Sequence, residues 1–319
     1  MDNTQQVTVT HHTRTAPVPE KSVRALLLER PLVIRLNGSA EYSIMRTPGH
    51  DRELAIGFLF TEGLIRGIAD VGRLNECPDS ADVMEVTTLT AGGGPAKRTT
   101  TVNSSCGLCG RTDIDALLAA VAPVTASTTM PVSVLYEIPD RIRKTQLLFH
   151  ATGASHAAGL FGARGEILVA REDVGRHNAL DKVIGNRLLA GQSAEGCGAF
   201  LSGRASLEMI VKAARARLPI VAAVSAPTAA AVEAAERLCI TLCGFVRGAE
   251  VTVYTHEGRI RPARGAAGKG TEEGPGPMNP MRTAADAGTA GGSGDVVRTV
   301  PDPDREKNGG IPCARCASS

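Results

Sequence analysis

Two cysteines two residues apart, Cys106 and Cys109, are the side chains of this chain best suited to covalent chemistry. They stand in the sequence Ser-Ser-Cys-Gly-Leu-Cys-Gly, among small residues rather than apolar packing residues. A threonine-rich run before them favours a strand, and residues 112–115 have the capping-box spacing that opens a helix over 114–121. The amides and dipole of a helix N-terminus favour negative charge, and Arg111 adds to that field. The sequence therefore predicts a strand-to-helix loop on which at least one thiol is acidified toward the nucleophilic thiolate.

The spacing of this pair leaves three interpretations open: a thioredoxin-like redox couple, half of a zinc site, or two unreactive loop cysteines. A zinc site needs two further thiolates, and Cys313 and Cys316 near the C-terminus repeat the spacing of Cys106 and Cys109. The long C-terminal segment would then have to close onto the loop. Metal analysis of the purified protein distinguishes this interpretation from the other two.

The overall composition excludes several classes of protein. A net charge of +2 over 319 residues is too small to indicate a nucleic-acid or membrane surface as partner. No apolar run approaches the roughly 18 residues of a membrane-spanning helix, and the polar N-terminus lacks the apolar segment of a signal peptide. Eight cysteines in a chain of this length do not indicate a disulfide framework. We therefore expect a cytoplasmic protein that binds specific partners and neither nucleic acid nor membrane.

Composition also divides the chain into three parts. Residues 1–20 are polar and are expected to be flexible, whereas residues 21–261 are expected to form one domain. Residues 262–319 contain 11 glycines and 7 prolines among 58 residues and no aromatic residue. Such a composition cannot bury enough apolar surface to offset the entropy lost on ordering. We therefore expect this C-terminal tail to be disordered.

The first part of the domain, to about residue 122, is rich in predicted strands. A hairpin is predicted where Asn37 and Gly38 supply the positive backbone angles of a type I′ turn. After it, Asp51 is placed to cap a helix that Gly63 ends. The predicted strands of this part cover residues 32–36, 41–46, 83–90 and 97–102.

From about residue 132, helical and strand patterns alternate. Pro139 is suited to a first helical turn and predicts a helix that runs to about Leu148. The alternation indicates an α/β fold with helices packed on a largely parallel or mixed sheet and ligands at the strand ends. Further helices are predicted over 176–189, 206–216 and 228–238, and strands over 167–170, 199–202, 220–225, 240–245 and 250–255.

Three turns in this second part carry side chains that bind anions. His150 and His156 flank a glycine turn, Arg176 and His177 open a predicted helix, and Arg204 precedes another. Helix N-termini bind phosphate, and these side chains add donors. The alternative interpretation is structural: hydrogen-bonded histidines, helix capping and surface ion pairs. Two such turns that face one sheet edge would form an anion site.

The sequence Ser-Cys-Gly-Leu-Cys-Gly resembles the signature of the formate dehydrogenase accessory sulfurtransferase family, FdhD. The hairpin with Asn37 and Gly38 and the three turns resemble further motifs of that family in the same order, and the resemblance covers about residues 32–260. It implies a three-layer α/β core similar to the cytidine deaminase fold, with a mixed sheet, and a homodimer. The C-terminal tail with Cys313 and Cys316 has no counterpart in the family pattern.

The resemblance also implies a function. Members of this family are sulfur carriers that formate dehydrogenase requires for activity. They take persulfide sulfur from a cysteine desulfurase and bind the molybdenum bis(molybdopterin guanine dinucleotide) cofactor. They transfer the sulfur to this cofactor before it enters formate dehydrogenase, and they need no metal of their own. The alternative is a non-catalytic chaperone that binds the molybdenum cofactor and hands it to the enzyme.

By the same resemblance, Cys106 carries the persulfide and Cys109 is the accompanying thiol. Arg247 is suited to a phosphate, and Glu250 to the donor edge of guanine. A guanine nucleotide such as GDP is therefore expected to bind, with Arg204 and His177 as further donors. The family's cofactor-binding segment falls on Phe245, Val246, Arg247, Gly248, Ala249 and Glu250.

Overall fold

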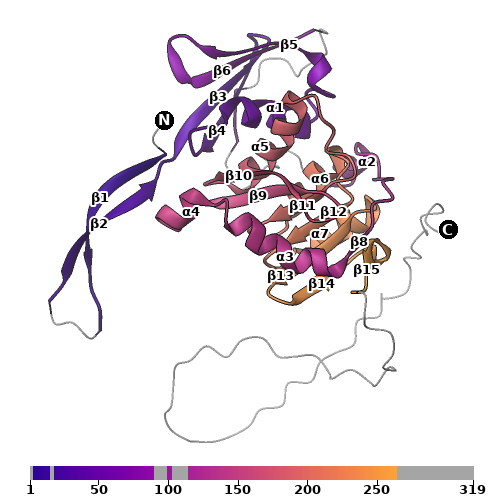
Figure 1. The fold of residues 1–319 in the computed structure, drawn as a ribbon. Helices are drawn as coiled ribbons and strands as arrows, with labels where there is room; N and C mark the ends of the chain where they lie inside the picture. Colours follow the sequence, from indigo (N-terminus) through magenta and orange to yellow (C-terminus); the bar gives the residue numbers. More distant parts are fainter. Residues whose placement is uncertain (1–2, 15–17, 90–98, 103–113, 264–319) are drawn as a thin grey trace, which may run out of the picture. The chain divides into compact units, whose positions relative to one another are not determined.

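The computed structural model describes residues 3–14, 18–89, 99–102 and 114–263, with the backbone alone over 99–102 (Figure 1). The predicted cysteine loop with Cys106 and Cys109 lies outside the described residues. The C-terminal tail, whose disorder the sequence predicts, also lies outside them from residue 264 onward.

The larger of the two main sheets has six strands in the order β10-β9-β11-β12-β13-β14. The three strands β11, β12 and β13 run parallel, and the other pairs in this sheet are antiparallel. This sheet confirms the predicted α/β class with a mixed sheet. Its strands are β9 (His156–Phe161), β10 (Ile167–Asp173), β11 (Gly198–Leu201), β12 (Ile220–Ala223), β13 (Thr241–Arg247) and β14 (Glu250–Val253).

Helices cover both faces of this sheet, because its strands are apolar on both sides. Alternate residues of β9 enter different cores: Ala158 packs with the helices of one face and Ala157 with the helix of the other. The result is three layers, helix–sheet–helix (Figure 1). One face carries α2 (Ile114–Ala119), α5 (Arg176–Leu189), α6 (Leu207–Arg215) and α7 (Ala229–Arg237), and the other carries α3 (Val132–Arg143).

The second main sheet has five strands in the order β5-β6-β3-β4-β7 and packs on α1 (Asp51–Thr61). The predicted hairpin is confirmed, since Asn37 and Gly38 connect β3 to β4 with φ angles of 54° and 64°. The N-cap of α1 is His50 rather than the predicted Asp51, whose carboxylate instead pairs with Arg46 at 2.8 Å. The strands are β3 (Arg30–Leu36), β4 (Ala40–Arg46), β5 (Val71–Cys77), β6 (Ser80–Thr88) and β7 (Thr99–Val102).

Helices α1 and α5 join the two parts of the domain through direct backbone contact. A Cβ atom at Gly57 would clash with the carbonyl oxygen of Asp181. A Cβ atom at Gly185 would clash in the same way with the carbonyl oxygen of Glu53. Only glycine permits this approach at either position. Beside this contact, the buried ammonium of Lys212 on α6 lies 2.8 Å from the Asp181 carboxylate, so an ion pair also links α5 to α6.

The N-terminal segment differs from its sequence prediction. Residues 1–20 were expected to be flexible, but β1 (Thr4–His11) and β2 (Glu20–Leu27) form an antiparallel ribbon that pairs with no other described strand. Alternating Val and Thr residues of β1 favour extended backbone, and β2 supplies the partner strand that the polar composition did not indicate.

The helix predicted to begin at Pro139 also begins elsewhere. Helix α3 starts at Val132, and Pro139 lies inside it. Leu135, Ile138 and Ile142 lie on one face of α3 and are fully buried against the sheet, which outweighs the hydrogen bond that proline cannot donate. A separate short helix, α4 (Leu147–Thr152), covers the end of the predicted segment. The remaining short elements are η1 (Ile68–Asp70), β8 (Met130–Pro131), η2 (Glu257–Arg259) and β15 (Ile260–Arg261).

Candidate functional site

A cavity of about 450 Å³ opens where β11, β12 and β13 end at one edge of the six-stranded sheet. This is the edge at which open α/β sheets bind ligands. Strand β9 runs antiparallel to β11, so its first residues reach the same edge. One wall is formed by His156, Phe200, Ser202, Val224, Val246, Arg247 and Gly248, and a second wall by Pro139, Asp140, Arg143, Gln146 and Phe149 of the α3–α4 segment with Gly153, Ala154 and Ser155 after it.

Two arginines of this cavity are held against aromatic rings. The guanidinium carbon of Arg143 lies 4.9 Å from the ring centre of Phe149, and that of Arg247 lies 5.6 Å from the ring centre of Phe245. Contact with a ring face positions a guanidinium without neutralising it. Neither arginine forms an ion pair with any residue that the structure describes. Two positive charges therefore remain available for an anionic ligand.

His156 lies where β9 begins. Its ring makes no hydrogen bond with the described residues, and a Cβ atom at Gly203 would lie 3.4 Å from it. Burial lowers the pKa of His156, the positive charge of Arg176 lowers it further, and Asp173 opposes both. The imidazole is therefore neutral at pH 7, with one nitrogen to donate and one to accept.

Ser202 adds a donor to the same wall. Its hydroxyl oxygen accepts the backbone N–H of Ala157 at 2.8 Å, which leaves the hydroxyl proton free for a ligand. Ser155 differs, because its hydroxyl is already donated to the Glu172 carboxylate at 2.6 Å.

The predicted cofactor-binding segment is divided by the structure. Val246, Arg247 and Gly248 line the cavity, and Phe245 supports the Arg247 guanidinium from outside it. Ala249 and Glu250 are exposed and lie outside the cavity lining.

The other predicted donors lie elsewhere. Arg204 is exposed and does not line the cavity. His177 is buried, and its ring lies 3.5 Å from the hydroxyl of Ser206, the N-cap residue of α6. His177 therefore holds helices together rather than facing a ligand.

The turn before α5 is not an anion site either, because its backbone amides donate to a carboxylate of the protein. The Asp173 carboxylate accepts the backbone N–H of Gly175 at 2.8 Å and that of Thr47 at 3.2 Å. It also pairs with the buried ammonium of Lys182 at 2.7 Å. A carboxylate of the protein thus occupies the place that a bound phosphate would take.

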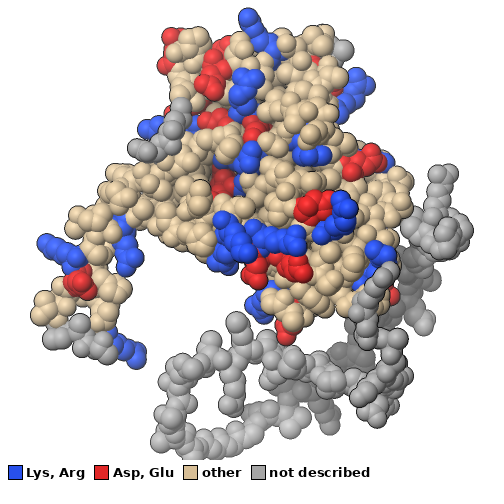
Figure 2. Space-filling model, viewed as in Figure 1, with Lys and Arg blue, Asp and Glu red and all other residues tan. Residues whose placement is uncertain are grey.

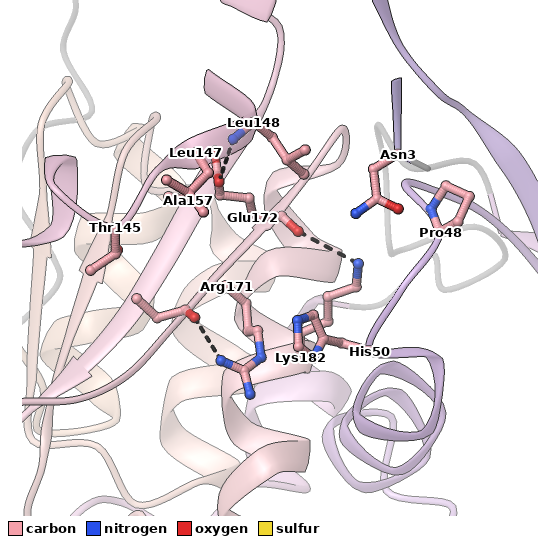
Figure 3. Close-up of a pocket in the computed structure, with 11 residues that line it drawn as sticks. Asn3, Pro48, His50, Thr145, Leu147, Leu148, Ala157, Arg171, Glu172 and Lys182 are labelled. Atoms are coloured by element: carbon pink, nitrogen blue, oxygen red, sulfur yellow. Dashed lines mark hydrogen bonds between the residues drawn. The ribbon is translucent and has the colours of Figure 1, made fainter. Parts of the chain in front are cut away.

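In a second cavity, of about 240 Å³, the charged side chains are likewise paired with groups of the protein itself (Figure 3). Besides Asp173, the Lys182 ammonium reaches the carbonyl oxygens of Thr47 and Glu172 at 3.0 and 3.5 Å, so each of its three protons has an acceptor. The Glu172 carboxylate accepts two backbone amides and a serine hydroxyl, and Arg171 is paired with a glutamate of α1. This cavity is therefore structural, whereas the cavity at the sheet edge keeps donors and acceptors that no described residue pairs with.

Sequence reasoning missed the α3–α4 wall of the site, which contributes Asp140, Arg143 and Phe149. These residues carry no recognisable motif, and the prediction of one helix to about Leu148 did not show that Phe149 lies on a separate helix, α4. The described part of the chain contains no helix long and apolar enough to cross a membrane.

The chain is similar to proteins of known family. Residues 27–261 match the model of the FdhD/NarQ family. The chain is 40% identical to a sulfur carrier protein FdhD of Anaeromyxobacter dehalogenans over 254 residues, which is 74% of this chain and 88% of that protein. It is also 40% identical to a sulfur carrier protein FdhD of Mycolicibacterium paratuberculosis over 274 residues, which is 82% of this chain and the whole of that protein.

A solved structure has a similar fold. The crystal structure of a putative formate dehydrogenase accessory protein from Desulfotalea psychrophila superposes with a TM-score of 0.66 at 24% identity. The match covers 82% of this chain and all of that one.

Proposed function

The chain belongs to the FdhD/NarQ family, and from this premise we propose that it is a sulfur carrier that serves a formate dehydrogenase. The observation that carries the proposal is the 40% identity to curated sulfur carriers over most of the chain. In this proposal Cys106 holds the sulfur as a persulfide, and the molybdenum bis(molybdopterin guanine dinucleotide) cofactor receives it. A cysteine desulfurase donates the sulfur, and the carrier acts as a cytoplasmic homodimer with a core similar to the cytidine deaminase fold.

The loading step needs only a thiolate. The Cys106 thiolate attacks the outer sulfur of the desulfurase persulfide, a new S–S bond forms on Cys106, and the desulfurase cysteine leaves as a thiolate. No electrons are gained or lost overall. Arg111 and the predicted helix N-terminus support this step, because both favour the thiolate form of the attacking sulfur.

The release step assigns a role to Cys109. Its thiolate attacks the inner sulfur of the Cys106 persulfide, which forms a Cys106–Cys109 disulfide and expels hydrosulfide toward the cofactor. The persulfide sulfur is thereby reduced, and the two cysteines are oxidised. A dithiol reductant must then reopen the disulfide before the next cycle.

The cavity at the sheet edge suits one nucleotide end of the cofactor as bound substrate. Its volume of about 450 Å³ lies in the range of small-molecule sites, roughly 300–1,000 Å³. Phe200, Val224 and Val246 offer an apolar floor, while Arg143 and Arg247 offer charge to a diphosphate. These features support a nucleotide subsite rather than a pocket for the whole cofactor.

A non-catalytic cofactor chaperone is the second candidate, because the cavity alone supports cofactor binding without any thiol. Mass spectrometry after incubation with a cysteine desulfurase and cysteine separates the two candidates. The sulfur carrier gains one sulfur atom on Cys106, and the Cys106→Ala variant gains none. A wild-type protein that binds the cofactor but takes up no sulfur would support the chaperone.

A further inference from the structure

A third cavity, of about 330 Å³, lies where α1, α5 and α6 end. Helices α5 and α6 lead into the beginnings of the parallel strands β11 and β12, so this cavity lies at the opposite edge of the sheet from the sheet-edge cavity. Phe60 and Leu188 in its lining each pack against the cores of both parts of the domain. We therefore call it the seam cavity.

Three arginines, Arg66, Arg215 and Arg217, line the seam cavity, and no carboxylate among the described residues does. This differs from the face drawn in Figure 2, where Lys and Arg side chains over α3 have Asp and Glu side chains beside them. The ion pairs of Arg66 with Asp70 and of Arg217 with Glu195 are long, at 3.6 Å each, and lie at the surface. Surface pairs of this kind are weak, so both guanidinium groups can turn toward a ligand.

The loop after α5 adds two further donors to the lining, Gln192 and Ser193. The side-chain oxygen of Gln192 accepts the Arg187 guanidinium at 2.5 Å, which leaves the amide NH₂ group for a ligand. The Ser193 hydroxyl oxygen accepts the backbone N–H of Glu195 at 3.0 Å and keeps its own proton to donate. Arg187 also donates to the carbonyl oxygen of Ser193 at 3.0 Å, so this wall is held against α5 before any ligand arrives.

Arg217 occupies a backbone conformation that favours glycine, with a φ angle of 59°. Its N–H donates to the carbonyl oxygen of Ala214, and the N–H of Leu218 donates to that of Ala213, both at 2.9 Å. These two bonds form the Schellman motif that ends α6, in which the left-handed residue is usually glycine. One nitrogen of the guanidinium donates to the Thr125 hydroxyl at 3.1 Å and so orients the side chain. The strained backbone indicates that a guanidinium is needed at this point.

The lining of the seam cavity combines an apolar surface with donors for an anion. Phe60, Ile184 and Leu188 can cover a hydrocarbon chain, and a guanidinium binds a carboxylate through two parallel hydrogen bonds. The volume lies at the lower end of the range of small-molecule sites, roughly 300–1,000 Å³. Because Arg66 and Arg217 share their charge with carboxylates, a singly charged group suits the lining better than a doubly charged phosphate.

We propose that the seam cavity binds a small monocarboxylate with an apolar chain. The three arginines hold the carboxylate, and the apolar residues of α1 and α5 cover the chain. This site is separate from the sheet-edge cavity and plays no part in the proposed sulfur transfer. Since residues from both parts of the domain line the cavity, a bound ligand links the two parts and raises the melting temperature.

The test is calorimetric titration of acetate, butanoate, hexanoate and octanoate into the full chain. The affinity should rise up to about fourfold for each added CH₂ group until the cavity is filled. Octanol, which has the same chain length as octanoate and no charge, should bind at least about tenfold more weakly. Absence of octanoate binding, or equal affinities for octanoate and octanol, would overturn the inference.

Two arginine variants test the site in the same titration. Arg217→Gly removes one guanidinium and suits the left-handed backbone, so the fold is kept while the octanoate affinity falls about tenfold. Arg237→Ala is the matched control, because Arg237 lies in the last turn of α7, pairs with one carboxylate and does not line the cavity. It should leave the octanoate affinity unchanged. Equal affinities of wild type and Arg217→Gly would contradict the assignment.

A third variant separates the seam cavity from the sheet-edge cavity. Arg247→Ala removes a guanidinium from the sheet-edge cavity and should leave octanoate binding as it is in wild type. Loss of octanoate affinity in Arg247→Ala but not in Arg217→Gly would place the carboxylate at the sheet edge and overturn the inference. Octanoate should also raise the melting temperature of Arg247→Ala as much as that of wild type, and that of Arg217→Gly less. Circular dichroism of each variant checks that the helices are intact.

Discussion

In the proposed function single residues carry the sulfur chemistry, and Cys106 and Cys109 differ in the role proposed for them. Cys106→Ala should abolish activation of formate dehydrogenase, because the proposed function assigns the persulfide to the Cys106 thiolate. Cys109→Ala should reduce activation less, since external thiols can also release sulfur from a persulfide. Formate dehydrogenase activity in cells that carry each variant as the only copy measures the effect. Full activity with Cys106→Ala would remove the persulfide role.

Arg247 makes the second residue-level test, on nucleotide binding. Arg247→Ala removes a charge-assisted hydrogen bond of about 1.5 to 3 kcal/mol, so GDP affinity should fall about ten- to a hundredfold. Arg66→Ala removes an exposed guanidinium that does not line the cavity and provides the control in the same titration. An unchanged affinity for GDP in Arg247→Ala would place the phosphates elsewhere.

Glu53 links stability to pH. Burial by itself would raise its pKa, but hydrogen bonds from His50, Arg171 and Asn186 outweigh burial and lower the pKa from 4.5 to about 2. A carboxylate with a depressed folded pKa stabilises the protein above pH 4.5, and this stabilisation is lost as the pH falls toward 2. Urea unfolding across this range should show a steeper loss of stability for wild type than for Glu53→Gln. Parallel curves for the two proteins would contradict the assignment.

Sequence motifs indicated some of the residues that line the sheet-edge cavity and gave no signal for others. Arg247 and Gly248 were found through their place in the family segment and do line the cavity. Asp140 and Arg143 were missed, because an ordinary acid and an ordinary base on a helix have no distinctive spacing. His177 was predicted as a donor because it opens a helix, which many histidines do. In the structure its side chain is buried.

The close contact between helices α1 and α5 can be tested by its contribution to the stability of the fold. Gly57→Ala would place a methyl group against the carbonyl oxygen of Asp181, and overpacking of this kind costs about 1 to 3 kcal/mol or more. Gly67→Ala is the control, because nothing lies within 4 Å of a Cβ atom there. Chemical denaturation should show a large loss for the first variant and little change for the second. Equal stabilities would mean that the two helices separate easily.

Helices, strands and turns were predicted correctly where nearby residues in the sequence determine them. The Asn37-Gly38 hairpin and the helix at 176–189 were predicted correctly, because turn chemistry and side-chain periodicity act over a few residues. The start of α3 and the ribbon of β1 and β2 were not, because each depends on a distant partner. In α3 that partner is the sheet that buries Leu135, and in β1 it is β2.

For the whole molecule, the first test is removal of the C-terminal tail. A protein ending at Arg261 should fold, show an unchanged melting temperature and mature formate dehydrogenase about as well as the full chain. The expectation rests on the Gly- and Pro-rich composition of the tail. Loss of activity together with loss of bound zinc would favour a four-cysteine zinc site that includes Cys313 and Cys316.

The strand order of the six-stranded sheet could not be predicted from the sequence. Alternating helix and strand patterns indicated an α/β fold, and the mixed sheet follows that expectation. Nothing in the local sequence determines that β9 lies between β10 and β11, because that choice depends on pairing between strands far apart in the chain. The two walls of the cavity could not be brought together from the sequence for the same reason, since one comes from α3 and the other from strand ends much later in the chain.

The separation of these two walls along the chain has a consequence for protein synthesis. Arg143 leaves the ribosome well before Arg247, and β13 is the last parallel strand of the sheet to be made. A nascent chain therefore has only half of the cavity until nearly the whole domain has emerged. Chains that end early, before β13, would lack the second wall and would not hold the ligand that we propose for this cavity.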